Sequence, residues 1–133
     1  MSPEGGIPDL SGLRVLVVED DEDTRELLVE LIASAGADVT SAGWAEDALA
    51  AFAAQPHDLV LSDIGLPDRD GYALLREIRA SGEAGASVPA VALTAFTGRE
   101  EGARAIAAGF QRRITKPIDE GALFRAVREL LKV

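Results

Sequence analysis

Residues 57–72 read HDLVLSDIGLPDRDGY, and this stretch decides the fold. The apolar run at residues 59–61 is short and continuous, which is typical of a buried strand. It leads to Asp63, and a loop rich in glycine and proline then ends the strand. A lone aspartate in such a loop is often only a turn former. Whether Asp63 has a chemical role therefore depends on what the other strands carry at the same place.

Apolar patterns of two different periods alternate along the whole chain. Apolar runs predict strands at residues 13–18, 59–62 and 88–93. Residues 38–41 are predicted to form a short, weak strand, and residues 111–114 a polar strand that suits only the edge of a sheet. Apolar residues at helical spacing predict helices within residues 27–35, 45–52, 72–79, 98–108 and 123–131. Five strand–helix pairs in strict alternation predict an α/β fold, a doubly wound parallel sheet with helices on both faces. For five strands we expect the flavodoxin-like order 2-1-3-4-5.

Length and composition favour one soluble domain. The 133 residues are 47% hydrophobic and 27% charged, and residues 12–133 are predicted to form the domain behind a flexible lead at residues 1–11. The net charge of -10 argues against binding to nucleic acid or to an anionic membrane. No apolar stretch approaches the roughly 20 residues that cross a bilayer. The absence of cysteine suits the cytoplasm, and frequent Arg and Ala favour a bacterial origin.

Polar side chains follow four of the predicted strands. In open parallel sheets, ligands bind beyond the carboxyl ends of the strands, and strands 1, 3 and 4 are neighbours in the predicted order. We therefore expect these side chains to converge on one small site. They are Glu19 and Asp20 after the first strand, Asp63 after the third, Thr94 after the fourth and Lys116 after the fifth.

This set of side chains indicates phosphoryl chemistry with a metal ion. Clustered carboxylates repel one another unless a cation intervenes, and a set made only of oxygen atoms favours Mg²⁺. Asp63 lies on the central strand and is the predicted nucleophile, while Thr94 and Lys116 are suited to contact phosphoryl oxygens. The predicted metal ligands are the carboxylates of Glu19, Asp20 and Asp63 and the backbone carbonyl of Gly65.

Four motifs, VLVVEDD, LVLSDIGLPDRDGY, VALTA and ITKP, occur in this order and spacing. Together they resemble the CheY-like receiver domain of two-component response regulators, over about residues 12–133. The resemblance implies that a histidine kinase or a histidine phosphotransfer protein phosphorylates Asp63 in the presence of Mg²⁺. It also implies that Thr94 and Lys116 contact the phosphoryl group, and that the peptide bond before Pro117 is cis. Such a receiver is a signalling module that catalyses only its own phosphorylation and dephosphorylation.

Arg113 departs from the pattern of this family. The family usually carries Tyr or Phe at this position of the fifth strand, and the ring moves when the Thr hydroxyl turns toward the phosphate. We hypothesise either that Arg113 is a charged substitute for the ring, or that this receiver passes its phosphoryl group on. Phe96 is expected to shield the phosphoryl group or to fill the core.

Several other side chains are predicted to have structural roles only. Asp21 is expected to cap the first helix and is therefore left outside the metal site. The fourth helix lacks large apolar anchors, so we expect it to be loosely held. The remaining predictions are turn formers at Asp68 and Asp70, a solvated His57, a half-buried Trp44, and a solvated helix face at Glu100, Glu101 and Arg104.

Four alternatives remain open from the sequence. A phosphatase of the haloacid dehalogenase type would need a DxDxT-like stretch, but Ile64, Gly65 and Leu66 follow Asp63. A flavodoxin-like cofactor binder would need a Ser/Thr/Gly-rich loop after the first strand. A receiver could also serve as an unphosphorylated binding platform, or be the receiver portion of a hybrid histidine kinase. The downstream partner is not identified by any motif, and a weak homodimer is left open.

Overall fold

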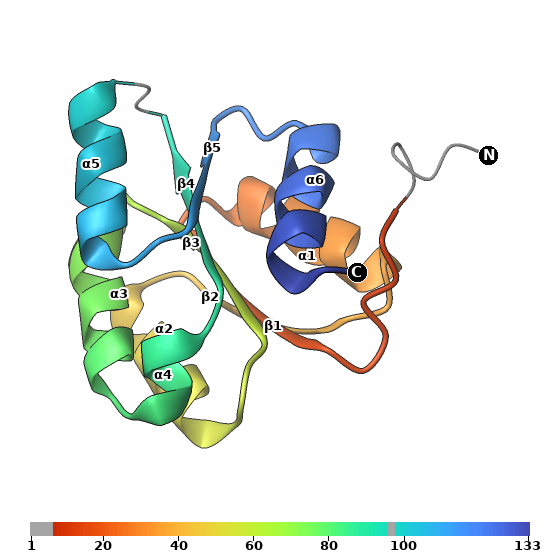
Figure 1. Ribbon diagram of the computed structural model, residues 1–133, viewed down its shortest axis with the longest axis horizontal. Coiled ribbons are helices and arrows are strands. Elements are labelled where there is room, and N and C mark those ends of the chain that lie inside the picture. The colour runs from red at the N-terminus through yellow and green to blue at the C-terminus, as the bar shows by residue number, and fades with distance from the viewer. Residues whose placement is uncertain (1–6, 96–97) are drawn as a thin grey trace.

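The computed structural model describes residues 7–95 and 98–133, so Phe96 and the first six residues of the predicted lead lie outside the described residues (Figure 1). Five parallel strands form one sheet in the order β2-β1-β3-β4-β5, which confirms the predicted fold. The strands are β1 (Arg14–Val18), β2 (Asp38–Ala42), β3 (Leu59–Asp63), β4 (Ala90–Thr94) and β5 (Arg112–Thr115).

Six helices are present within residues 7–95 and 98–133, one more than predicted. They are α1 (Glu22–Ser34), α2 (Ala45–Ala54), α3 (Gly71–Ala80), α4 (Glu83–Ser87), α5 (Arg99–Ala108) and α6 (Glu120–Leu131). The additional helix, α4, has five residues and begins at Glu83. It directly follows Ser81 and Gly82, which were expected to end the third helix. Its sequence, EAGAS, contains no large apolar residue, so it has no hydrophobic period that could have revealed it.

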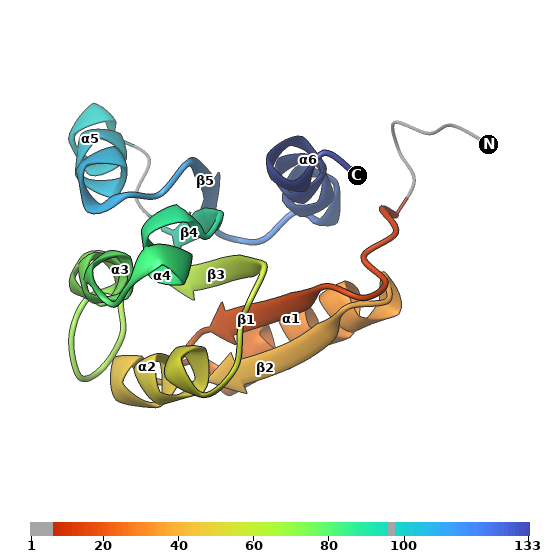
Figure 2. The same ribbon diagram turned by 60° about the horizontal axis from the view of Figure 1, so that its bottom comes forward.

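The helices cover both faces of the sheet. Helices α1 and α6 lie on one side, and α2, α3 and α5 lie on the other (Figure 2). Alternate side chains of each strand point to opposite faces: Val15 and Val17 pack toward α1 and α6, while Leu16 and Val18 pack toward α2 and α3. Because both faces are buried, the central strands β1, β3 and β4 are continuous apolar runs. Within residues 7–95 and 98–133, no helix is long and apolar enough to cross a membrane.

Packing begins before the predicted start of the domain at residue 12. The Leu10 side chain is fully buried, and its backbone N–H donates to the carbonyl of Ala35 at 2.8 Å. Leu10 thereby extends the core that lies beneath α1 and α6.

Helix α5 is anchored by polar contacts. It buries only Ala105 and Ala108, in agreement with its lack of large apolar anchors. The Tyr72 hydroxyl, however, donates to Glu101 Oε1 at 2.7 Å, and the Arg104 guanidinium lies 4.5 Å from the centre of the Tyr72 ring. The prediction of a solvated helix face is therefore wrong for Glu101, whereas Glu100 and Arg104 are exposed. Tyr72 is 29 residues away in sequence, so the helix alone could not reveal this contact.

His57 is buried, although a solvated loop residue was predicted. Its side chain is stacked against Phe52, with ring centroids 5.7 Å apart. Burial lowers the pKa of His57 from its ordinary value of 6.5, and Arg14 adds to the lowering, while the backbone of Gln55 and the Asp58 carboxylate oppose it.

This lowered pKa predicts a pH-dependent stability. As the pH falls below about 6.5, the unfolded chain binds a proton at His57 before the folded chain does, so His57 contributes a loss of folding stability. The variant His57→Phe retains the ring and should show a shallower fall in unfolding free energy between pH 7 and pH 5. Urea unfolding at several pH values measures this, and identical slopes for the two proteins would contradict it.

Candidate functional site

Strand register brings the predicted side chains to one edge of the sheet. In the β1–β3 pair, Val18 lies opposite Ser62, so the next residues are Glu19 and Asp63. In the β3–β4 pair, Asp63 lies opposite Leu93, which places Thr94 one residue beyond. Parallel strands end at the same edge, and their terminal side chains meet there.

Three carboxylates at this edge are close enough to share a metal ion. One oxygen from each of Glu19, Asp20 and Asp63 lies within 4.8 Å of the others. Glu19 and Asp63 are buried, whereas Asp20 is exposed, so the cluster opens to solvent on one side. Carboxylate oxygens of this kind suit a hard divalent cation that retains part of its water shell. The donor set therefore fits Mg²⁺.

Lys116 bridges two of these carboxylates. Its Nζ lies 2.7 Å from Glu19 Oε1 and 3.2 Å from Asp63 Oδ1. Burial by itself would lower the pKa of Lys116, but Glu19 and Asp63 together raise it, so the lysine is charged. An ammonium group in this position lies beside the carboxylate of the predicted phosphoacceptor.

Glu19 is held without access to solvent. Burial raises the pKa of Glu19 to about 7, even though Lys116 and the amide of Asp21 act in the opposite direction. The Asp21 N–H donates to Glu19 Oε2 at 3.1 Å. Asp21 itself caps α1 by accepting from the Thr24 N–H at 2.9 Å, which confirms its predicted structural role.

The loop after β3 shapes the surroundings of Asp63. The Gly65 N–H donates to Asp63 Oδ1 at 3.2 Å, so Gly65 contacts Asp63 through its amide. The role of the Gly65 carbonyl as a metal ligand stays a prediction. Gly71, the first residue of α3, lies against the backbone of Asp63: a Cβ atom there would be 2.3 Å from the Asp63 carbonyl oxygen. Its N–H donates to the carbonyl of Ile64 at 2.7 Å, which closes the loop.

Thr94 and the segment after β5 complete the edge. Thr94 is buried, and its carbonyl accepts from the backbone N–H of Lys116 at 2.7 Å, so the two predicted phosphoryl contacts are joined through the main chain. The peptide bond between Lys116 and Pro117 is cis, as the family resemblance implied.

Arg113 contacts the start of α5. Its Nη1 donates to the carbonyl of Gly98 at 3.0 Å. The same nitrogen lies 3.2 Å from the position that a Cβ atom would occupy at Gly102, so the guanidinium lies along the first turn of the helix. The residue at the family's usual aromatic position therefore connects β5 to α5.

Two further side chains lie beside the site: Arg25, which the sequence analysis did not single out, and Asp68, which was predicted to be a turn former. Arg25 of α1 donates from Nη1 to the carbonyl of Glu19 at 2.8 Å. Asp68 is more than a turn former, because its carboxylate accepts from the N–H groups of Ala45 and Glu46 at 2.8 and 2.9 Å. The sequence offered one weak signal for Asp68: Trp44, immediately before α2, provides no side-chain cap.

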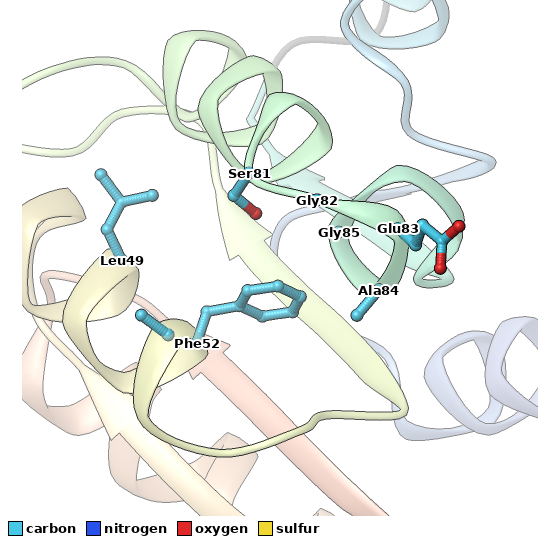
Figure 3. A pocket seen from close by; sticks show the side chains of 8 residues that line it. Leu49, Phe52, Ser81, Gly82, Glu83, Ala84 and Gly85 are labelled. Atoms are coloured by element: carbon cyan, nitrogen blue, oxygen red, sulfur yellow. The ribbon is translucent and has the colours of Figure 1, made fainter.

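A separate hollow of about 350 Å³ lies between α2 and the α3–α4 connection (Figure 3). Its lining includes Leu49, Phe52 and Ala84, and Glu83 is its ionisable residue. It is formed where α2 and α3 end, and helices of this fold run opposite to the strands. The hollow is therefore at the amino ends of the strands, away from the carboxylate cluster.

A parallel 2-1-3-4-5 sheet with three carboxylates and a lysine at its carboxyl edge defines a flavodoxin-like receiver. The family model of the response regulator receiver domain matches residues 15–128, and the chain belongs to this family. It is a receiver domain of the phosphorelay type.

Individual relatives include short proteins and parts of long ones. The chain is 38% identical over 120 residues to an uncharacterised 14.6 kDa protein of Leptolyngbya boryana, covering 90% of this chain and 91% of the relative. It is 32% identical over 117 residues to the sensor histidine kinase RcsC of Escherichia coli K12, covering 88% of this chain but only 12% of the kinase.

A solved structure extends the comparison to a metal-bound receiver. The receiver domain of the sensor histidine kinase PA1611 from Pseudomonas aeruginosa PAO1 superimposes with a TM-score of 0.83 at 31% identity. The match covers 92% of this chain and all of that domain, whose structure contains a magnesium ion coordinated in the active site cleft.

Proposed function

We propose that Asp63 accepts a phosphoryl group from the phosphohistidine of a histidine kinase or a histidine phosphotransfer protein, and that Mg²⁺ is the required cofactor. The observation that carries this proposal is the bridge from Lys116 to both Glu19 and Asp63 beside the carboxylate cluster. A partly buried ammonium next to an aspartate nucleophile offers a donor for the oxygens of the incoming group.

The contacts of Asp63 assign different roles to its two oxygens. Oδ1 accepts from the Gly65 amide and lies beside Lys116, so we assign Oδ2 as the attacking atom. Oδ2 forms a bond to phosphorus while the bond from phosphorus to the donor imidazole nitrogen breaks, and that nitrogen keeps the electron pair. Lys116 and the Thr94 hydroxyl would then contact the phosphoryl oxygens. Glu19, Asp20 and Asp63 would hold Mg²⁺, which would neutralise negative charge on the transferring group.

The same arrangement supports a signalling role without a diffusing substrate. The acceptor is a residue of the chain itself, so the only reactions we assign are its phosphorylation and slow dephosphorylation. We place this exchange in the bacterial cytoplasm, as composition favours.

Arg113, through its contact with Gly98, is the proposed charged substitute for the usual aromatic ring, and the downstream partner would bind near α5. The likeness to receivers of RcsC and PA1611 supports a hybrid histidine kinase as a second setting.

Phosphorylation by a small phosphodonor tests the proposal. With acetyl phosphate and Mg²⁺, intact-mass spectrometry should show one added phosphoryl group on the wild-type chain. The adduct should be absent in Asp63→Asn and after removal of the metal with a chelator. Asp58→Asn is the matched control, because this carboxylate lies at the start of β3, where it accepts from the Arg14 N–H at 2.8 Å. An adduct that persists in Asp63→Asn would refute Asp63 as the acceptor.

A further inference from the structure

The turn between β2 and α2 lies beside the loop after β1, because β1 separates β2 from β3 in the sheet, and the loop after β3 reaches it through Asp68. The turn consists of Gly43 and Trp44, and the residue before it, Ala42, accepts from the Glu19 N–H at 3.0 Å. The turn itself provides no carboxylate to the cluster. Its contacts to both loops therefore call for an explanation.

Arg25 holds the loop after β1 and packs against this turn. Its Nη1 donates to the carbonyl of Glu19 at 2.8 Å and lies 3.4 Å from the carbonyl of Asp20, so one guanidinium holds the backbone of both predicted metal ligands. The same nitrogen lies 3.1 Å from the place that a Cβ atom would occupy at Gly43. The guanidinium is thus packed directly against the turn, and the glycine leaves room for it.

Asp68 fastens the turn to the loop after β3. Its two carboxylate oxygens accept from the N–H groups of Ala45 and Glu46, the first residues of α2. These bonds replace the cap that Trp44 does not provide, and a carboxylate is favoured at this positive end of the helix. The Ala45 amide holds the pKa of Asp68 below its usual value, against a small opposing effect of burial, so the carboxylate is charged.

We propose that the β2–α2 turn joins the two halves of the magnesium site, and that Arg25 and Asp68 are positioning residues that set the separation of Glu19 and Asp20 from Asp63. This inference rests on the proposed binding of Mg²⁺. The physical reason is twofold: the carboxylates repel one another before a cation binds, and Mg²⁺ accepts little deviation from octahedral geometry. Contacts behind a metal site that orient its ligands typically contribute 10–100-fold to metal affinity, and we expect the lower end here.

The test is the Mg²⁺ dissociation constant of the full chain, measured from amide shifts in two-dimensional NMR spectra. Arg25→Met and Asp68→Ala should each weaken Mg²⁺ binding by about tenfold. Arg25→Lys and Asp68→Asn should weaken Mg²⁺ binding less, because the lysine ammonium still reaches one carbonyl and the asparagine amide oxygen still accepts a hydrogen bond. In the double variant, Mg²⁺ binding should weaken by less than the product of the two single effects, since both side chains contact the same turn.

Matched controls separate positioning from a general loss of stability. Arg79 also holds backbone carbonyls, donating to Gly85 and Gly109 at 3.0 and 2.6 Å, but it lies at the end of α3. Asp58 likewise accepts a backbone N–H from a distant segment, at the start of β3. Arg79→Met and Asp58→Ala should reduce stability to chemical denaturation while leaving the Mg²⁺ dissociation constant within twofold of wild type.

The outcomes are distinct. Weakened binding in the Arg25 and Asp68 variants, with unchanged binding in the two controls, would support the inference. The inference would be overturned if folded Arg25→Lys and Asp68→Asn bind Mg²⁺ with wild-type affinity, and if Arg25→Met and Asp68→Ala, where they fold, do so as well. Equal weakening in the controls would also overturn it. Failure of the wild-type chain to bind Mg²⁺ would instead refute the metal in the proposed function, and the inference with it.

Discussion

Replacing Gly71 with alanine should lower the unfolding free energy by about 3 kcal/mol, as severe overpacking does. The new Cβ atom would lie 2.3 Å from the Asp63 carbonyl oxygen and 2.9 Å from Ile64 Cα. Both atoms belong to the backbone, so no side-chain rotation relieves the clash. Either α3 or the end of β3 must move, and the second movement displaces Asp63.

Chemical unfolding monitored by circular dichroism measures this effect, and phosphorylation of the folded fraction reports on Asp63. Gly98→Ala is the matched control, because no atom lies within 4 Å of a Cβ atom built there. Its unfolding free energy should stay within about 0.5 kcal/mol of wild type. A stability of Gly71→Ala equal to that of the control would mean that the close approach to Asp63 has no energetic consequence.

Replacing Lys116 with methionine should lower the unfolding free energy by about 2 kcal/mol at pH 8, less than for a fully buried pair because the lysine is partly exposed. The fully buried Glu19 then loses its ammonium partner and faces the Asp63 carboxylate alone. In the intact protein the pKa of Glu19 is already about 7, and removal of the ammonium raises it further.

The raised pKa of Glu19 makes the destabilisation by Lys116→Met depend on pH. At pH 5.5 Glu19 carries a proton in both folded proteins, so the variant has no unpaired charge at Glu19 and the difference from wild type should shrink. Added Mg²⁺ should also reduce the difference at pH 8, because the cation supplies the missing counter-charge. Urea titrations at the two pH values, with and without Mg²⁺, measure both effects. The exposed Lys132 provides the control Lys132→Met. A destabilisation that is the same at both pH values would exclude an unpaired Glu19 as its cause.

The spacing of apolar residues predicted the strands and their order in the sheet well. The three central strands, β1, β3 and β4, are continuous apolar runs, as burial on both faces requires, whereas β2 and β5 lie at the edges of the sheet and are largely polar. Strict alternation of strands with helices allows few topologies, so the order β2-β1-β3-β4-β5 could be predicted correctly. The residue types at the strand ends predicted the carboxylate cluster in the same way, because parallel strands end at one edge.

What the sequence alone determined is thus the set of strands, their order and the chemistry at their carboxyl ends. Only the tertiary structure decided which distant side chains support that edge. Asp68 caps a helix that begins 23 residues before it, and Tyr72 reaches Glu101 across 29 residues. Such contacts depend on how separate helices and loops pack. A polar side chain that satisfies a distant backbone group has no periodic pattern, so neither spacing nor composition reveals it.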